Sequence, residues 1–531
     1  MYSIDISLNH GRRYKMKRKG LWRQVSIAMS ALTAMGVVLS GCGQTGTGTE
    51  TSSSVSSGQD TTAEANTTET STLDTSKMPV VTMVLPNSGK TDNLADVEAE
   101  INKILAKEVG AQIKITFLGY GSYRQQINMS LTNPGESDIV EISGPSTYAA
   151  NGELLDLTPY WENADQRLKD MFKEEYIDAN KIDGKLYAIP ANINFSNETL
   201  VHVNRKMYDE LGYEVDDEKI WTLDEIHDLV AAAKKKWPDV YGIVPQGGAL
   251  LVNDLNYDTL GDPYNIGVVE DHGKTGKVIS VTDCQEFIDF SKTMRQWYQE
   301  GLIMQDVLSN TEGWSALVPT GTAFADFDAG AYPNGGTTDD SLYYNLTVYP
   351  NWSAANCAVR IDFAIAANTA DPQAAFNVLQ ECYLNEDICN LLSYGIEGVN
   401  YIVNNEGKAD FPEGVTLESD SYTTGFVSPW VVPNMMGALL PYSSPDGYYD
   451  KIKEYDSKAD ISGCMGVVFD STKCPDEYSA CINVYNKYFC AIFSGAVDTD
   501  ENLALFKKEL KDAGEDVVIA EKQAEIDAAK K

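Results

Sequence analysis

Strand-like runs and helical periodicities alternate along the chain from about residue 78. Residues 80–85, 112–117 and 137–142 predict strands, and residues 80–85 have the apolar pattern of a strand that is buried on both faces. Residues 94–109 and 123–131 carry the periodicity of helices. This βαβαβ order predicts a parallel sheet with right-handed crossovers, and therefore an α/β fold.

A parallel sheet binds ligands at the loops that follow the carboxyl ends of its strands. In this chain those loops are residues 86–89, 119–122 and 143–148. Asn87 and Ser143 are candidate ligand contacts only because each ends one of the predicted parallel strands.

A second α/β unit begins near residue 197. Thr222, followed three residues later by Glu225, forms a capping box and predicts a helix that runs through Lys236. Residues 502–531 have a helical, charged pattern with a break at Gly514. A length of 531 residues suggests about three folding units.

The N-terminal segment has the order of a secretory signal peptide. Basic residues gather at 17–23, residues 25–39 are apolar apart from three hydroxyl side chains, and Leu39-Ser40-Gly41 leads to Cys42. The apolar stretch is too short for a settled transmembrane span. Small residues that end in Cys resemble a bacterial lipobox, which implies removal of residues 1–41 and a diacylglycerol on Cys42. The alternative is an ordinary signal peptide with an incidental cysteine.

The lipobox interpretation predicts a protein on the outer face of the bacterial plasma membrane, since two acyl chains attach a protein firmly. Met16 is the better start codon because it leaves a conventional basic head. Residues 42–77 are rich in Ser and Thr and lack apolar periodicity, so we expect them to be a disordered tether between the membrane and the folded part.

The charge excludes some partners. The chain has 41 basic and 78 acidic residues, and residues 1–41 hold seven of the former and one of the latter. The processed chain therefore has 34 basic and 77 acidic residues and a formal net charge of −43. Such a surface repels phosphate backbones and anionic headgroups, so we expect no nucleic acid and no direct lipid-surface binding.

Cysteine and histidine usage argues against a metal site of the Cys/His type. Eight cysteines and three histidines follow Cys42, with no C-x-x-C motif. Cys382/Cys389 and Cys481/Cys490 each fall in one predicted helix, whose rise holds their Cα atoms beyond disulfide reach. We expect buried free thiols. Residues 498–502 begin like a calcium loop but lack its Gly and final Glu. We predict no metal and no cofactor.

Several segments match one known family. They are residues 138–140 (DIV) with 151–159 (NGELLDLTP), residues 183–190 (DGKLYAIP) and residues 321–325 (GTAFA). Their order and spacing resemble extracellular solute-binding proteins of ABC importers, the maltose-binding-like family 1. Residues 391–398 (LLSYGIEG) and 520–523 (AEKQ) resemble its LipO/LplA-type lipoproteins. Residues 428–434 (SPWVVPN) depart from the subfamily's W-M-x-G-N-Q segment.

The resemblance implies a two-lobed, periplasmic-binding-protein-like α/β fold with a ligand cleft between the lobes. Lobe one would comprise residues 78–196 and 349–395, and lobe two residues 197–348 and 396–531. It also implies a monomer that captures a solute by hinge closure and delivers it to the permease subunits of an ABC importer. The expected solute is a carbohydrate, with an oligosaccharide favoured and peptides as the alternative.

A sugar presents an apolar ring face and a rim of hydroxyls, so its receptor needs aromatic platforms and polar side chains. Trp352, Trp430 and Tyr332 lie in predicted loops, and the family counterpart of the Tyr332 segment contributes aromatics to the cleft. Further candidates are Tyr148, Asn194, Asn197 and Tyr257. For each, packing is the alternative role.

Two other classes of function remain open. A glycan-active enzyme could use a close carboxylate pair, but the sequence has no G-x-S-x-G elbow, no H-E-x-x-H motif and no phosphate-binding loop. We therefore predict a protein that is not an enzyme. A surface sensor or adhesin that binds glycans or peptides without transport has the same sequence features as an importer component.

Overall fold

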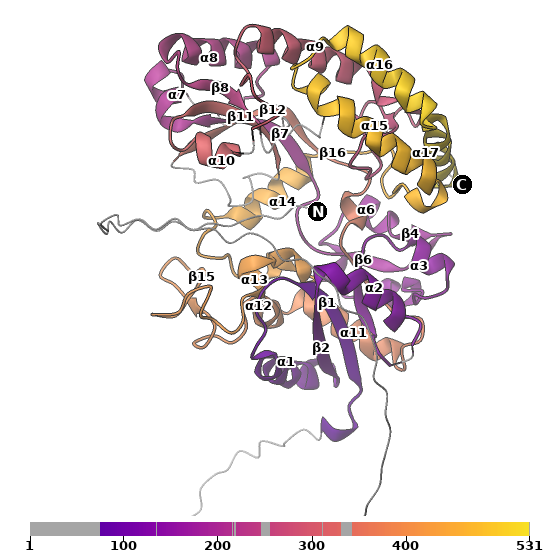
Figure 1. Ribbon diagram of the computed structural model, residues 1–531. Helices are drawn as coiled ribbons and strands as arrows, with labels where there is room; N and C mark the ends of the chain where they lie inside the picture. Colours follow the sequence, from indigo (N-terminus) through magenta and orange to yellow (C-terminus); the bar gives the residue numbers. More distant parts are fainter. Residues whose placement is uncertain are drawn as a thin grey trace, which may run out of the picture. The chain divides into compact units, whose positions relative to one another are not determined.

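The computed structural model describes residues 75–529, except 134, 215, 217–218, 246–254, 311 and 331–341. The expected signal peptide, Cys42 and Tyr332 lie outside this part. Two five-stranded sheets organise it (Figure 1). In spatial order, the first sheet contains β2 (Gln112–Gly119), β1 (Val80–Asn87), β3 (Ile139–Ile142), β13 (Asp362–Ile365) and β6 (Ala188–Pro190). The second contains β16 (Asp460–Ile461), β12 (Tyr343–Ser353), β7 (Asn197–Asn204), β11 (Ala323–Gly330) and β8 (Tyr241–Val244).

Helices and three small hairpins surround the sheets. The helices of the described residues are α1 (Leu94–Glu108), α2 (Tyr120–Ser130), α3 (Ser146–Ala150), α4 (Thr158–Glu162), α5 (Gln166–Lys169), α6 (Glu174–Asp178), α7 (Arg205–Leu211), α8 (Leu223–Lys236), α9 (Gln285–Gln299), α10 (Trp314–Leu317), α11 (Pro372–Leu384), α12 (Glu386–Tyr394), α13 (Thr424–Val427), α14 (Tyr448–Lys458), α15 (Pro475–Phe493), α16 (Thr499–Asp512) and α17 (Glu515–Ala529). The hairpins pair β4 (Lys181–Ile182) with β5 (Lys185–Leu186), β9 (Val268–Val269) with β10 (Val278–Ile279), and β14 (Ile402–Val403) with β15 (Ala409–Asp410).

The predicted parallel βαβαβ unit is confirmed in the first sheet. Strand β1 pairs in parallel with both β2 and β3, so that Met83 lies opposite Ile115 on one side and Ile139 on the other. Both faces of β1 are buried: Met83 packs in one core cluster with helix α1, and Val84 packs in another with helix α2. A strand covered on both faces needs apolar residues at successive positions, which explains the unbroken apolar run.

Helix α2 begins earlier than the sequence pattern predicted. We expected residues 123–131, whereas the helix starts at Tyr120, directly after the last residue of β2. Gly119 has extended backbone angles at this junction, so the chain changes from strand to helix within one residue. This early start places Tyr120 at the edge of the first sheet.

The second sheet has one apolar face and one face that carries polar side chains. Val201, Val203 and Phe327 belong to a large core that helices α8 and α9 cover. Helix α10 contacts β11 and contributes Trp314 to a smaller core cluster (Figure 1). The predicted capping box of α8 is confirmed, because Thr222 and Glu225 exchange side-chain-to-backbone hydrogen bonds of 2.9 and 3.2 Å.

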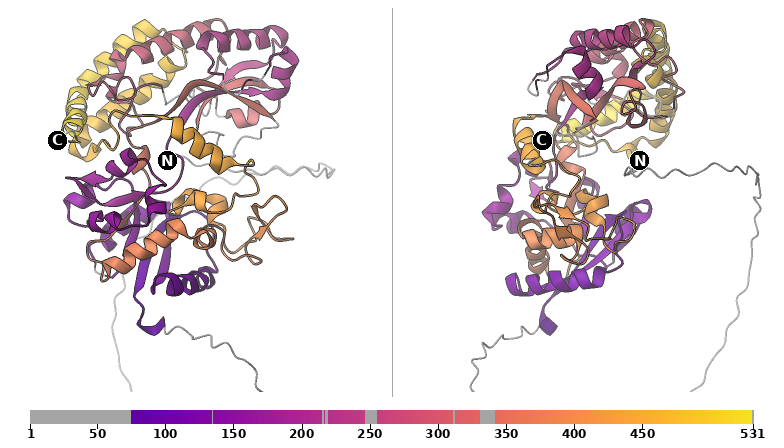
Figure 2. Two further views of the ribbon diagram at one scale, coloured as in Figure 1. Left: turned by 180° about the vertical axis from the view of Figure 1, so that it is seen from behind. Right: turned by 90° about the vertical axis from the view of Figure 1, so that its left-hand side faces the viewer.

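The three C-terminal helices pack on this second core. Tyr485 and Phe489 of α15, Phe506 of α16 and Val518 of α17 are all part of it. The helices lie beside the second sheet in all the views (Figures 1 and 2). The predicted break at Gly514 is confirmed: its φ is +97°, and a Cβ there would approach Cγ of Glu477 to 2.8 Å.

Within the residues that the structure describes, the chain passes between the two sheets three times. The segments are residues 191–196 between β6 and β7, residues 354–361 between β12 and β13, and Ala459 between α14 and β16. We expected the last passage near residue 396. Instead, Tyr422, Val431 and Ile452 pack in the same core as β1. We therefore propose that residues 396–458 belong to lobe one and not, as expected, to lobe two.

Cysteine placement agrees only partly with expectation. The eight cysteines of the described residues form no disulfide bond. Cys481 and Cys490 share helix α15, as predicted, but Cys382 and Cys389 lie on α11 and α12, because the chain turns at Asn385 between them. Within the described part of the chain, every helix is too short or too polar to cross a membrane.

Candidate ligand-binding site

Four strand ends and one strand start meet at one edge of the first sheet. Strands β1, β2, β3 and β6 end there, and the antiparallel strand β13 begins there. The loops that we predicted to meet a ligand, residues 86–89, 119–122 and 143–148, follow three of these strands. This edge is therefore the part of lobe one in which convergent side chains are expected.

A cavity of about 200 Å³ lies at this edge. Its walls come from β1, α2, β3, the segment before β13 and the segment after α13; they are Pro86, Tyr120, Tyr123, Arg124, Glu141, Arg360, Ile361, Trp430 and Val431. Tyr120, Tyr123 and Arg124 reach it together because residues three and four apart lie on one face of helix α2.

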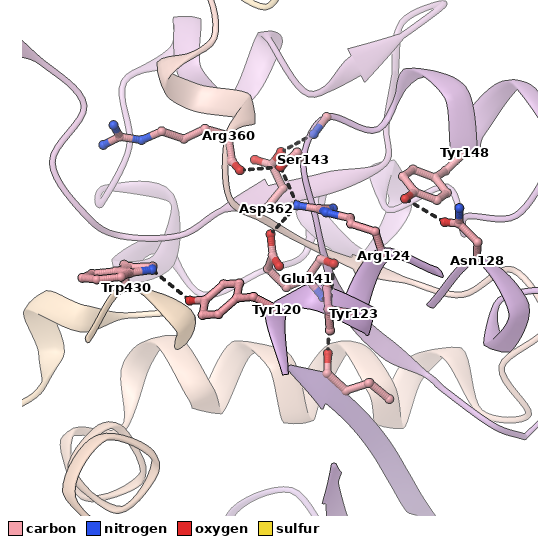
Figure 3. Close-up of polar contacts among 12 residues, drawn as sticks. Tyr120, Tyr123, Arg124, Asn128, Glu141, Ser143, Tyr148, Arg360, Asp362 and Trp430 are labelled. Atoms are coloured by element: carbon pink, nitrogen blue, oxygen red, sulfur yellow. Dashed lines mark hydrogen bonds and ion pairs between the residues drawn. The ribbon is translucent and has the colours of Figure 1, made fainter. Parts of the chain in front are cut away.

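Two aromatic side chains on this wall hold each other in place. The indole Nε1 of Trp430 donates a hydrogen bond to the phenol oxygen of Tyr120 at 3.0 Å (Figure 3). Trp430 remains 37% exposed and Tyr120 42% exposed. An aromatic ring that is fixed at its polar end and open on the rest suits the apolar face of a ring-shaped ligand.

Polar groups stand beside these rings. Arg124 Nη2 lies 3.3 Å from Glu141 Oε1 and donates to Ser143 Oγ at 2.6 Å (Figure 3). Ser143 Oγ in turn donates to the carbonyl oxygen of Arg360 at 2.8 Å. The result is a connected row of a guanidinium, a carboxyl and a hydroxyl, the donor and acceptor types that ligand hydroxyls require.

Burial raises the pKa of Glu141 to about 7, because loss of water penalises the carboxylate more than the neighbouring Arg124 favours it. Both the neutral and the ionised form are therefore populated near neutral pH. Tyr123 fixes this residue, since its hydroxyl accepts from the Glu141 backbone N–H at 2.9 Å and lies 3.0 Å from the Val84 carbonyl oxygen. This contact ties β3 to β1 beneath the cavity.

Of the predicted site residues, Trp430 lines the cavity and Ser143 contacts its wall. Tyr148 lies nearby, where its hydroxyl donates to Asn128 Oδ1 at 3.0 Å (Figure 3). Asn87 is at the end of β1, but its amide is engaged with Gly89 and Thr424. Its observed contacts orient the loop and the start of α13.

The other predicted residues lie elsewhere. The backbone carbonyl of Asn194 accepts a hydrogen bond from Arg360, and Asn197 begins β7. Trp352 was expected in a loop but lies in strand β12. Its buried ring stacks on the His272 ring, with 4.6 Å between the ring centroids. Tyr257 is buried in the core of lobe two. Ligand contact by these residues remains a prediction, and Tyr332 lies outside the described residues.

The sequence analysis missed Tyr120, Arg124, Glu141 and Arg360. Tyr120 could have been predicted, because it lies in the loop 119–122 that was expected to meet a ligand. Glu141 could also have been predicted, because it is a glutamate inside the apolar strand of residues 139–142 and carboxylates are rarely buried unless they are paired. Arg124 and Arg360 carry no comparable signal, as surface arginines occur throughout any chain.

A larger hollow of about 530 Å³ lies at the edge of the second sheet. Lys234, Tyr241, Met304 and Gln305 are among its walls. It is found at the beginning of strand β8, whereas α/β sheets bind ligands at carboxyl ends. One partly exposed tyrosine is its sole aromatic wall residue. The smaller cavity is therefore the better candidate.

The comparison with known families decides the class of protein. The family model described as "Bacterial extracellular solute-binding protein" matches residues 89–387, more than half of the chain. The chain belongs to this family. A second model, a domain of unknown function, matches residues 464–531, which contain helices α15 to α17. The resemblance predicted from the sequence motifs is thus confirmed, and the members of the family are binding proteins, not enzymes.

Individual relatives agree with this assignment. A carbohydrate ABC transporter substrate-binding protein of Streptococcus pneumoniae is 24% identical over 95% of this chain and 98% of its own length. Lipoprotein LipO of Bacillus subtilis is 24% identical over 43% of this chain and 46% of its own. The crystal structure of the N-glycan transport solute binding protein NgtS of S. pneumoniae has a TM-score of 0.68 and 22% identity, covering 85% and 99% of the two chains. This likeness confirms the predicted fold.

Proposed function

We propose that this solute-binding protein captures a carbohydrate, preferably an oligosaccharide, and delivers it to the permease subunits of an ABC importer. The observation that carries the proposal is the pair Tyr120 and Trp430, two partly exposed rings beside Arg124, Glu141 and Ser143. Rings and hydroxyl-binding groups in one cavity match the two surfaces of a sugar.

Two relatives support the choice of ligand class. The pneumococcal relative is described as a carbohydrate transporter component, and NgtS has also been solved in complex with Man1GlcNAc. A cavity of about 200 Å³ is smaller than the 300–1,000 Å³ usual for ligand pockets. We infer that lobe one holds part of the solute. Lobe two would supply the other contacts when the two lobes close over it by bending at the three segments that connect them. Closure would shift the population toward a form that the permease recognises.

The proposal includes a lipid anchor on Cys42 at the outer face of the plasma membrane. The lipobox-like sequence before Cys42 supports it. In a bacterial host, mass spectrometry of the N-terminal peptide should show a diacylglyceryl group on Cys42. The Cys42→Ser variant should lose the lipid and appear in the medium or as uncleaved precursor. A wild-type chain without lipid would refute the anchor.

The test of ligand class uses residues 43–531 and records the melting temperature with a panel of mono- and oligosaccharides and a panel of peptides. A ligand at about a hundred times its Kd stabilises by about 2.7 kcal/mol, which shifts the melting temperature by about 1 °C or more. A shift confined to sugars supports the proposal. Shifts with peptides alone, or with neither panel, would overturn it.

A further inference from the structure

A histidine and two aspartates meet beneath helix α10, on the polar-bearing face of the second sheet. His202 lies on β7 directly opposite Asp326 on the antiparallel strand β11. Asp328 is two residues further along β11, and its side chain therefore points to the same face as that of Asp326. His202 and Asp326 are fully buried, and the side chain of Asp328 is 13% exposed.

The three donor atoms converge on one point. His202 Nδ1 lies 3.4 Å from Asp326 Oδ2 and 3.7 Å from Asp328 Oδ2, and all three ligand atoms fall within 4.8 Å of one another. These distances exceed the usual 2.7–3.2 Å of an N–H···O hydrogen bond. They are close to the separation of about 3.3–3.6 Å between neighbouring ligands of a tetrahedral ion with metal–ligand bonds of about 2.0–2.2 Å.

A second observation points to a cation. Asp326 is buried, yet its Oδ1 atom has no hydrogen-bond partner among the described residues. Among those residues Asp326 also forms no ion pair with a lysine or an arginine. A buried carboxylate in this state is costly unless a positive charge is nearby. One protonated imidazole would leave two carboxylates with a net charge of −1, whereas a divalent ion beside a neutral imidazole balances them.

Aromatic rings enclose the cluster. The ring of Trp314 lies 4.6 Å from the imidazole of His202, and that of Tyr343 lies 5.9 Å from it. Both rings are largely buried. They restrict the orientation of the imidazole and exclude water, so that the cluster is suited to a structural ion rather than a catalytic one.

We propose that His202, Asp326 and Asp328 bind one divalent transition-metal ion of the zinc class, which cross-links strands β7 and β11. One imidazole nitrogen with two carboxylate oxygens is a donor set for such an ion, whereas calcium and magnesium prefer oxygen donors alone. The sequence analysis predicted no metal, because it considered only Cys/His sites and a calcium loop. This mixed set has no local motif, because the strand register brings together residues 124 positions apart.

The test removes metal from residues 43–531 with EDTA, transfers the protein to metal-free buffer, adds ZnCl₂ and then measures the zinc that stays bound. We expect wild type to retain one zinc ion per chain on desalting and to melt at a higher temperature with ZnCl₂ than with EDTA. The variants His202→Gln and Asp328→Asn should bind zinc at least about tenfold more weakly. Asp328 is chosen because it is the most exposed of the three ligands.

His227→Gln is the matched control. His227 also has two carboxylate neighbours, but Asp228 approaches Nδ1 at 3.2 Å and Glu300 approaches Nε2 at 2.6 Å. Carboxylates on opposite ring nitrogens cannot converge on one ion with the imidazole, so this variant should bind zinc as wild type does. Zinc binding that is equal in wild type, His202→Gln and Asp328→Asn would overturn the proposal, as would wild type without bound zinc.

X-ray absorption on the zinc-loaded wild type keeps the proposal testable even if both variants fail to fold. Nitrogen and oxygen ligands alone are expected. Sulfur ligands would assign the ion to the cysteines and overturn the proposal. A melting temperature raised by CaCl₂ or MgCl₂ at lower concentration than by ZnCl₂ would overturn the choice of a transition metal.

Discussion

Trp430 donates a hydrogen bond of 3.0 Å to Tyr120, although 310 positions separate the two residues in sequence. Trp430 comes from the segment 428–434, which differs from the W-M-x-G-N-Q segment of the LipO/LplA-type lipoproteins. Tyr120 begins helix α2 at the edge of the first sheet. The departing segment therefore contributes an aromatic wall to the cavity of lobe one, where a change of residue type would alter the ligand that fits.

The hydrogen bond between these rings should contribute to affinity. Tyr120→Phe retains the ring and removes the acceptor of the Trp430 N–H, so we expect the Kd for the sugar to rise about 3–10-fold. Isothermal titration calorimetry measures this change. Tyr213→Phe, a partly exposed tyrosine of lobe two, is the control and should leave the Kd unchanged. Equal affinity of Tyr120→Phe and wild type would show that the hydrogen bond does not position the ring.

Glu141 should make stability depend on pH. Its pKa is about 7 in the folded protein and ordinarily 4.5, so between these values the folded protein holds a proton that the unfolded chain has released. Stability contributed by this group is therefore lost as pH rises from about 4.5 to 7, by about 3 kcal/mol in total. Glu141→Gln should remove this loss.

Urea denaturation of wild type and Glu141→Gln from pH 4.5 to 8 measures the contribution of Glu141 together with its effect on Asp362, whose pKa the Glu141 charge helps to raise. Glu100→Gln replaces an exposed glutamate and should follow wild type throughout. A wild-type stability that keeps a constant difference from Glu141→Gln across the range would refute the raised pKa.

Lys522 should be essential for the C-terminal helices. Its ammonium group is fully buried and donates to Asp262 Oδ2 at 2.8 Å and to the carbonyl oxygens of Thr259 and Gly267 at 3.0 and 2.8 Å. Lys522→Met leaves Asp262 as an uncompensated buried charge, so we expect a loss of about 3–5 kcal/mol in the free energy of unfolding. Denaturation monitored by circular dichroism measures it.

Lys508→Met provides the comparison. Lys508 pairs with Asp512 on the exposed face of helix α16, where water screens the two charges, so Lys508→Met should lose far less stability than Lys522→Met. If the two lysine variants lose similar amounts of stability, the buried pair is not the anchor that its geometry indicates.

Asp456 should stabilise the passages between the sheets. Its carboxylate accepts hydrogen bonds from the backbone N–H groups of Phe195 and Ser196 at 2.9 and 3.0 Å, and from the Ser196 hydroxyl at 2.5 Å. Asp456→Asn turns an amide group toward these donors, which should cost about 1–3 kcal/mol. Asp450→Asn changes an exposed residue on the same helix. Thermal denaturation that does not distinguish the two variants would contradict this role.

Local sequence patterns predicted several elements well because the signals for those elements are short-range. The apolar run at Val80, the capping box at Thr222 and the break at Gly514 each depend on residues within a few positions of one another. The edge of the sheet followed from the parallel order, and the loop that contains Tyr120 was identified on that basis.

The rest could not be predicted because it depends on packing between distant segments. The passage near Ala459 follows from Tyr422, Val431 and Ile452 joining the core of β1, and no local pattern records that choice. The sequence predicted that Trp352 lies in a loop, whereas in the structure this residue pairs with Asn197 of β7 and is buried. The convergence of Arg124 and Glu141 likewise required the register of β1, β2 and β3.

The most direct test of the account is a calorimetric titration of wild type, Trp430→Ala and Tyr213→Ala with the sugar that gives the largest thermal shift. Trp430 and Tyr213 are similarly exposed, at 37% and 39%, but only Trp430 lines the cavity. We predict a Kd about 10–100-fold higher for Trp430→Ala and unchanged for Tyr213→Ala. Wild-type affinity in Trp430→Ala would show that the ligand binds elsewhere and would contradict the proposed site.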